Sequence, residues 1–348
     1  MDGPLGRREE METPAARRDA RLAVTSARAA AAQGRRFARF LGTHGILLAL
    51  IILLAIGAAL SPHFLTAGNL SNVARNTSIV GIVAIGMTFV ILTRGIDLSV
   101  GSMLGFSAIV FALLMKSGVP WPLAILLTVA AGAMVGALNG LGITKGRLQP
   151  FIMTLGMLVI ARGVTMTLVD GKPQPLGPAA ADVAWLGTGS LLGIPVPVLL
   201  FVGIAAFAWF VLRHTTFGRH VYAVGDNPEA ARLSGISTNR VIFSVYVISG
   251  VCAAVAALIE VTRLSTGVPS QGTGMELDAI AIVVIGGTSL FGGEGGVGGT
   301  LVGAAIIAAV NNLLNLLGVS PFSQQIVKGL IILGAVFLER RTVREEGR

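Results

Sequence analysis

Three asparagines stand out near the C-terminal end of the chain because they lie in a stretch that is otherwise hydrophobic. They are Asn311, Asn312 and Asn315. Asn311 and Asn315 share one face of a helix, since side chains four residues apart are neighbours. A side-chain amide both donates and accepts hydrogen bonds. These residues can therefore bind the hydroxyl groups of a solute or tie neighbouring helices together, and the sequence leaves both interpretations open.

Several charged side chains fall at the depth of apolar stretches. Asp97 and Ser99 lie in the glycine-punctuated segment ILTRGIDLSVGS at 91–102, with Arg94 just before them, and Arg162 and Lys328 lie inside two further apolar stretches. A charge in such surroundings is costly and by default indicates function. We expect Asp97 to pair with one of the three cations and to fix a break in the chain. Asp97, Ser99 and Arg162 join the asparagines as candidates for a solute path.

The sequence has no pattern typical of a catalytic or metal-binding site. Its four histidines lack the spacing of metal ligands, and no catalytic triad is recognisable. The glycine-rich segment 292–300 is not followed by the GK[ST] that a nucleotide-binding loop requires. We therefore expect a protein that is not an enzyme and has no cofactor and no metal. The histidines are His44, His63, His214 and His220.

Composition indicates the elements that must position these residues. The chain has 348 residues, of which 53% are hydrophobic and only 12% are charged, and its mean hydropathy is +0.80. This excludes soluble enzymes, disordered chains and nucleic-acid-binding domains, and predicts an all-α polytopic membrane protein surrounded by lipid. We expect about ten transmembrane helices, near 42–60, 74–93, 101–116, 121–144, 151–169, 196–212, 241–259, 278–290, 300–316 and 323–338.

The distribution of lysine and arginine predicts the orientation. If the N-terminus is inside, the inner segments hold 19 of the 26 basic residues, as the positive-inside rule requires. Both termini are then cytoplasmic and the membrane is the inner, or plasma, membrane. We divide the chain into a partly disordered Arg/Ala-rich tail at 1–41, a transmembrane domain at 42–338 and a C-terminal tail at 339–348.

Two patterns concern the packing of the spans. Glycines at 132, 136 and 140 form a GxxxGxxxG row, which predicts close contact between helices. Spans two to five and seven to ten could be two pseudo-repeated halves. Each contains a glycine-punctuated break, at 91–102 and at 285–299, although composition alone could produce this likeness. Transporters often contain such repeats with interrupted helices.

The inner loop 213–240 contains a compact helix signature. Asn227 is a good N-cap, Pro228 suits the first helical position, and Gly235 can adopt the left-handed conformation that ends a helix. We predict a helix of about two turns at 228–234, too short to be stable alone in water, and expect a partner surface for it. The candidate residues are Asp226, Asn227, Pro228, Glu229, Ala230, Ala231, Arg232, Leu233, Ser234 and Gly235.

With that loop, several long motifs resemble the permease subunits of ribose-type ATP-binding-cassette sugar importers. The likeness runs from about Leu60 to Phe337 in the same order and spacing. Arg94 departs from it, because a small residue is expected before GIDLS. The motifs are GDNPEAARLSGI at 225–236, GMTFVILTRGIDLSVGS at 86–102, KGRLQPFIMTLGMLVIARGVTM at 145–166, ELDAIAIVVIGGTSL at 276–290 and NNLLNLLGVS at 311–320.

The resemblance implies a type II ABC-importer-like permease that forms the path for a monosaccharide, with D-ribose as the first expectation. It implies a homodimer or a pair with a sister permease, two separate ATPase subunits on the cytoplasmic face, and a periplasmic sugar-binding protein outside. The segment 226–235 would couple the permease to the ATPase, with Glu229 and Arg232 pairing with that partner.

A self-sufficient secondary transporter or channel for a small polar solute is the alternative. It predicts carboxylates within the membrane for proton or sodium coupling, and only Asp97 lies near that depth. The alternative also predicts that the chain alone is active in liposomes, whereas the importer requires a separate ATPase.

Overall fold

A computed structural model describes residues 45–345. The chain divides into two units, Met1–Leu48 and Ala49–Arg348. In the first unit only residues 45–48 are described, as the start of the helix Gly45–Leu60. The predicted tail at 1–41 and the last three residues lie outside the described part.

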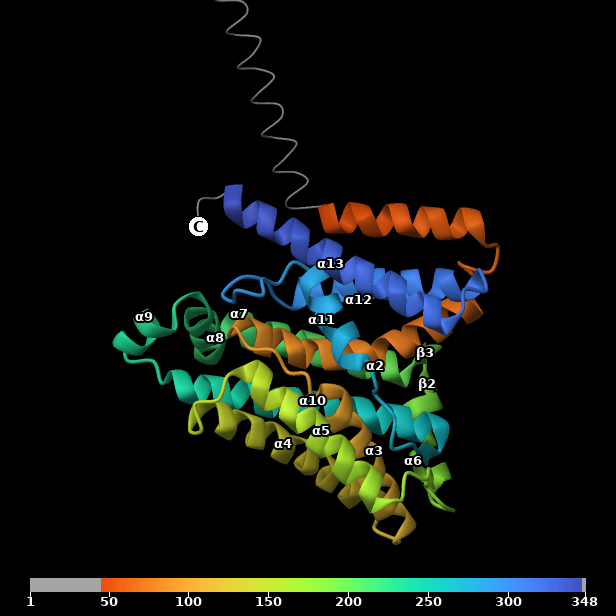
Figure 1. Ribbon diagram of the computed structural model, residues 1–348. Helices are drawn as coiled ribbons and strands as arrows, with labels where there is room; N and C mark the ends of the chain where they lie inside the picture. The colour runs from red at the N-terminus through yellow and green to blue at the C-terminus, as the bar shows by residue number, and fades with distance from the viewer. Residues whose placement is uncertain (1–44, 346–348) are drawn as a thin grey trace, which may run out of the picture. The chain divides into compact units, whose positions relative to one another are not determined.

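The second unit is built almost entirely of helices (Figure 1). After Gly45–Leu60, they are α2 (Ala67–Leu92), α3 (Val100–Lys116), α4 (Trp121–Thr144), α5 (Pro150–Leu168), α6 (Ala180–Thr188), α7 (Val196–His214), α8 (Thr216–Asp226), α9 (Pro228–Leu233), α10 (Thr238–Leu264), α11 (Met275–Ile285), α12 (Val297–Leu316) and α13 (Pro321–Glu345). The all-α prediction misses two small antiparallel pairs: β1 (Gln174–Pro175) with β4 (Thr266–Gly267), and β2 (Ser190–Leu191) with β3 (Ile194–Pro195).

Six described helices are long and apolar enough to cross a membrane, namely α2, α4, α5, α7, α10 and α12. Gly45–Leu60 and α3 are shorter apolar helices. Each of the ten predicted spans falls on a helix. The second predicted span, 74–93, falls on α2, which begins earlier, at Ala67. The prediction started too late because the first turns of α2 are polar. The eighth ends at Ile285 rather than 290, because Gly287 adopts a left-handed conformation with φ +81°.

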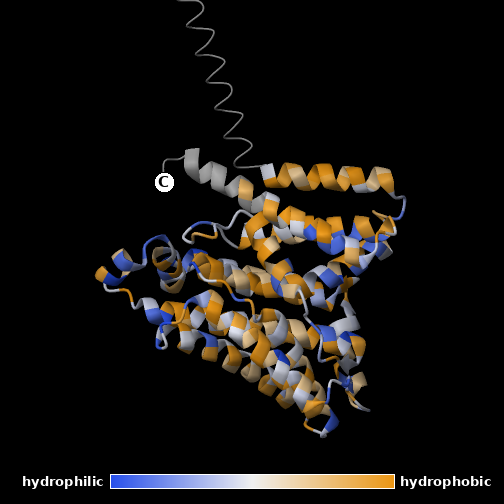
Figure 2. Cartoon of the chain, viewed as in Figure 1, coloured by the Kyte–Doolittle hydropathy of each residue, from blue (hydrophilic) through white to orange (hydrophobic). Residues whose placement is uncertain are grey.

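Helices α2 and α10 form the centre of the second unit. In their most apolar windows, 78% of the α2 residues and 61% of the α10 residues are buried, against 22–39% for the other four long helices. The surrounding helices expose large apolar side chains, among them Ile160, Phe207 and Phe322, and Figure 2 shows these helices as mainly hydrophobic. Exposed apolar side chains of this kind suit contact with lipid tails.

The glycine row on α4 is in close contact with another helix, as predicted, and the structure identifies that helix as α10. A Cβ added at Gly132 would lie 2.6 Å from the Gly250 carbonyl oxygen, and one added at Gly136 would overlap the Tyr246 carbonyl oxygen. Small residues allow the two helix backbones to approach closely, and this packing stabilises helices in membranes.

Gly136→Ala is expected to lower the free energy of unfolding by about 1–3 kcal/mol, because the methyl group forces α4 away from α10. Gly156→Ala on α5 is the matched control, since an added Cβ meets nothing within 4 Å there. Denaturant titration of the purified protein in detergent measures both. Equal stability of the two variants would contradict the close contact.

Candidate functional site

The predicted short helix in the loop after α7 is present as α9. The Asn227 side chain caps it, with Oδ1 accepting hydrogen bonds from the backbone N–H groups of Glu229 (3.1 Å) and Ala230 (3.0 Å). At its end Gly235 has φ +83°, and the Ile236 N–H donates to the Ala231 oxygen at 3.0 Å. Each feature satisfies backbone groups that a helix end leaves free. The helix prediction at 228–234 is therefore confirmed, with the last turn ending at Leu233.

Sequence reasoning missed the helix that precedes α9. Helix α8 begins after Thr215, whose hydroxyl accepts a hydrogen bond from the Gly218 N–H at 3.2 Å. The signal was the threonine itself, a good N-cap residue, followed by apolar residues at 217, 221 and 224. Helices α8 and α9 are two separate helices between α7 and α10 in the chain, and they lie next to each other (Figure 1).

The surface of α9 is open to a partner. Ala231 is its one buried residue, and Leu233 is 77% exposed. Glu229 and Arg232 pair with each other at 2.6 Å on the exposed face. The hydrogen bond and charge of Arg232 lower the pKa of the Glu229 carboxyl, so Glu229 stays ionised near neutral pH. The segment thus presents a charged pair beside an apolar side chain, a combination found at protein interfaces.

Asp97 lies at the break between α2 and α3 and is fully buried. Its Oδ1 accepts hydrogen bonds from the Ser99 backbone N–H (3.0 Å) and hydroxyl (2.6 Å), and its Oδ2 accepts one from the Ser249 hydroxyl on α10 (2.8 Å). The Asn139 amide on α4 in turn donates to the Ser99 hydroxyl at 2.8 Å. The carboxylate therefore ties the break to two neighbouring helices.

The predicted ion pair between Asp97 and a cation is wrong. Arg162 donates to the carbonyl oxygens of Pro269 (2.6 Å) and Gln271 (2.9 Å), and Lys328 pairs with Asp278 at 2.9 Å. Arg94 binds backbone carbonyls next to α9. Hydroxyl and amide donors solvate the Asp97 carboxylate instead. The local part of this arrangement is an Asx turn, in which an aspartate accepts from the N–H two residues on.

The structure divides the three asparagines of α12 by role. Asn312 exchanges two hydrogen bonds with Asn69 on α2, each of 2.8 Å, and Asn315 accepts one from Gln324 on α13 at 2.8 Å. Both therefore tie helices together. The Asn311 oxygen is buried and has no hydrogen-bond partner among the described residues. Among the three, Asn311 is therefore the one whose side-chain oxygen has an unused capacity to accept a hydrogen bond.

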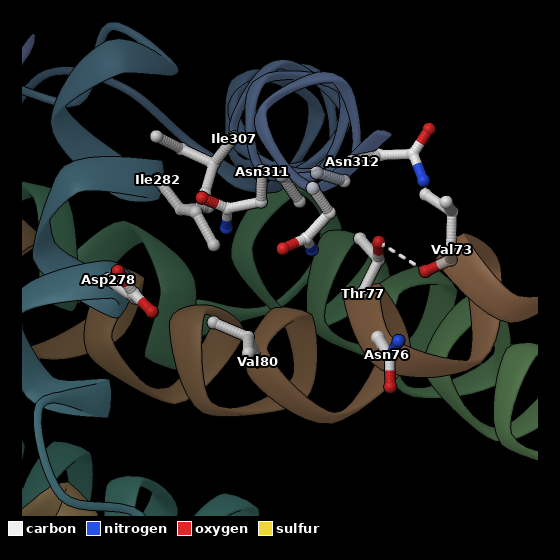
Figure 3. A pocket seen from close by; sticks show the side chains of 12 residues that line it. Val73, Asn76, Thr77, Val80, Asp278, Ile282, Ile307, Asn311 and Asn312 are labelled. Atoms are coloured by element: carbon white, nitrogen blue, oxygen red, sulfur yellow. Dashed lines mark hydrogen bonds between the residues drawn. The ribbon is translucent and has the colours of Figure 1, made fainter. Parts of the chain in front are cut away.

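Asn311, Asn312 and Asn315 all line a cavity of about 120 Å³ between α2, α11 and α12. Figure 3 shows Asn76 and Thr77 on α2 beside it and Asp278 on α11 facing it. A cavity of this size holds several water molecules. Sequence reasoning did not select Asn76 and Thr77, although both lie inside the predicted span 74–93, and it placed Asp278 only at the end of a span. The candidates Asp97, Ser99 and Arg162 do not line this cavity.

Comparison with known proteins assigns the chain to a family. A family model described as "Branched-chain amino acid transport system / permease component" matches residues 69–336. The ribose import permease of Escherichia coli (strain K12) is 48% identical over 297 residues, which cover 85% of this chain and 92% of the relative. The chain belongs to this permease family. It is accordingly a multi-pass membrane component of a transport system and not an enzyme.

Other relatives of the permease are also named for sugar transport. The ribose import permease of Bacillus subtilis (strain 168) is 47% identical, with coverage of 85% of this chain and 92% of the relative. The D-allose permease of Escherichia coli (strain K12) is 39% identical, with coverage of 87% and 93%. No solved structure matches the chain significantly.

Proposed function

We propose that this chain is the membrane permease of an ATP-binding-cassette importer for a monosaccharide, with D-ribose as the best-supported substrate. The identity of 47–48% to ribose import permeases over nearly their whole length carries this proposal. Permeases named for allose and xylose are 39% and 38% identical, which favours ribose over the other sugars.

The proposed partner proteins bind to the two opposite faces of the permease. Separate ATPase subunits supply the energy and contact α8 and α9, whose exposed charged pair and Leu233 form the docking surface. A periplasmic binding protein delivers the sugar on the other face, where α6 and the strand pairs are too small to be a recognition domain. A second permease copy completes the assembly in the inner membrane.

The proposal includes ten crossings of the membrane with both termini in the cytoplasm. Beyond the six long apolar helices, it assigns crossings to Gly45–Leu60, α3, α11 and α13. This topology places α8, α9 and the α4–α5 loop on the side of the basic residues, in agreement with the positive-inside rule.

Two pseudo-repeated halves are supported by the order of the elements. In α2–α5 and again in α10–α13, a long helix is followed by a non-helical segment, a shorter helix and two further helices. Figure 1 shows α2 and α10 running in opposite directions, as expected for an inverted repeat. The counterpart of 93–99 is then 265–274, whereas the sequence likeness to 285–299 reflects glycine content.

The cavity at Asn311 is proposed as part of the sugar path. Asn311→Ala is expected to slow uptake by about three- to tenfold, the effect of one hydrogen bond to the sugar, without loss of stability. Asn69→Ala is the matched control, because it removes the amide pair with Asn312 at a residue that does not line the cavity, and it is expected to cost about 1–3 kcal/mol of stability instead. Uptake into proteoliposomes and unfolding in detergent separate the two effects. Normal uptake by Asn311→Ala would contradict this part of the proposal.

The substrate is tested by binding of a panel of pentoses, hexoses and polyols to the cognate binding protein, followed by stimulation of ATP hydrolysis in the assembled complex. Ribose is expected to give the tightest binding and the strongest stimulation. Stimulation by branched-chain amino acids and not by any sugar would overturn the proposed substrate class.

A further inference from the structure

Arg94 lies where three segments of the chain meet. It belongs to the break between α2 and α3, it contacts the end of α8, and it packs against the loop between α11 and α12. A Cβ added at Gly292 of that loop would lie 2.5 Å from the Arg94 Cγ. The Gly293 N–H donates to the Leu92 oxygen at 3.0 Å. None of these residues lines the cavity at Asn311 or caps α9.

The backbone of Arg94 is in a conformation that favours glycine. Its φ is +63°, and its N–H donates to the Ile91 oxygen at 2.9 Å, directly after the end of α2. Helices commonly end with a glycine at this position. An arginine held in a strained conformation is an outlier that points to a role for its side chain.

The Arg94 side chain binds the last carbonyl groups of α8. Its Nε donates to the Gly225 oxygen at 2.5 Å and its Nη2 donates to the Asp226 oxygen. The positive charge also suits the negative end of the α8 dipole. A Cβ added at Gly225 would overlap the Leu92 oxygen, so α8 ends in direct contact with the end of α2. Arg94 therefore joins the residue before the α9 cap to the α2–α3 break.

The same break continues into the centre of the permease. Three residues after Arg94, Asp97 binds Ser249 on α10, and Ser99 is bonded to Asn139 on α4. A connection thus runs from the end of α8, which directly precedes α9, through Arg94 and the chain of the break to α4 and α10. Coupling between distant sites is carried by such contiguous contacts when the element between them has two arrangements.

We propose that Arg94 is a positioning residue that transmits movement of α8 and α9 to the α2–α3 break. The inference rests on the proposed function, because it assumes that an ATPase moves α9. Movement of α8 then shifts the α2–α3 break, because the Arg94 guanidinium is bonded to the end of α8. Without that side chain, movement of α9 by the ATPase has less effect on the sugar path.

The test compares Arg94→Gly with Arg147→Gly in proteoliposomes that contain the ATPase and the binding protein. Arg147 is a matched control, since it is also an arginine in a left-handed conformation, with φ +54°, and its side chain forms no hydrogen bond among the described residues. Sugar transported per ATP hydrolysed is the readout. Arg94→Gly is expected to lower this ratio by at least about fivefold, with unchanged or higher thermal stability because glycine relieves the strain. Arg94→Lys, which keeps one donor, is expected to restore part of the ratio.

An unchanged ratio in Arg94→Gly would overturn the inference, and so would an equal loss in Arg147→Gly. A loss of ratio that only follows a loss of stability would also overturn it, because Arg94 would then be a structural residue. These outcomes leave the proposed function intact when the wild-type complex transports sugar. A wild-type complex without ATP-driven sugar uptake would instead overturn the proposed function, and this inference with it.

Discussion

Gly235→Pro is expected to abolish ATP-driven uptake while leaving the permease folded in the membrane. Gly235 has φ +83°, which proline cannot adopt. Proline also removes the N–H that donates to the Arg232 oxygen at 3.0 Å. The end of α9 must therefore open. The rest of the permease should stay folded, because Gly235 has open space around its Cβ position and supports no packing in the core. We expect uptake to fall by about 100-fold, the upper range of measured coupling energies.

Gly118→Pro provides the matched control for this prediction. Gly118 follows α3 with φ +78°, and the next residue donates to the Leu114 oxygen at 3.1 Å, in the same pattern as Ile236 after α9. Its turn lies at the opposite end of the spans from α9 (Figure 1). Arg232→Glu is a second test, because it replaces the exposed pair with Glu229 by two like charges. Normal uptake and normal sugar-stimulated ATP hydrolysis in Gly235→Pro and Arg232→Glu would show that α9 does not couple the subunits.

Asp97→Ala is expected to destabilise the permease more than either Gly136→Ala or Asn69→Ala. The change leaves the Ser99 N–H and the hydroxyls of Ser99 and Ser249 without their acceptor in a fully buried position. Hydrogen bonds to a charged group contribute more than neutral ones, and unpaired buried donors are costly, so the expected loss is about 3 kcal/mol or more. Unfolding by SDS titration in mixed micelles measures it.

Asp97→Asn should lose less stability than Asp97→Ala, since the amide oxygen still accepts from one side. Asp182→Ala on the exposed surface of α6 should lose almost none. Equal stability of Asp97→Ala and Asp182→Ala would contradict the role of the carboxylate in holding the α2–α3 break.

Local patterns in the sequence predicted the elements most accurately. Apolar stretches located the long helices, because lipid demands continuous apolar helices. Asn227, Pro228 and Gly235 located α9, because caps act on neighbouring residues. The row of glycines located the contact between α4 and α10, although only the structure identifies α10 as the partner helix.

The predictions that failed depend on contacts between distant segments. A cation was predicted as the partner of Asp97 because the sequence shows its charge but not its neighbours in space. Its partner on α10 is Ser249, which lies 152 residues away in the chain. The separate roles of Asn311 and Asn312 depend on Asn69, which lies 243 residues from Asn312 in the polar first turns of α2. Arg94 was predicted only as a possible cation for Asp97 and as a departure from the expected small residue, and its contacts with α8 could not be inferred from spacing.

ATP-dependent uptake of labelled ribose into proteoliposomes tests the central proposal most directly. The permease is reconstituted alone, with the ATPase subunit, and with both the ATPase and the ribose-loaded binding protein. Uptake is expected only in the complete system with ATP, and it should be lost in Gly235→Pro. Sustained ribose uptake by the permease alone, driven by a proton or sodium gradient, would contradict it.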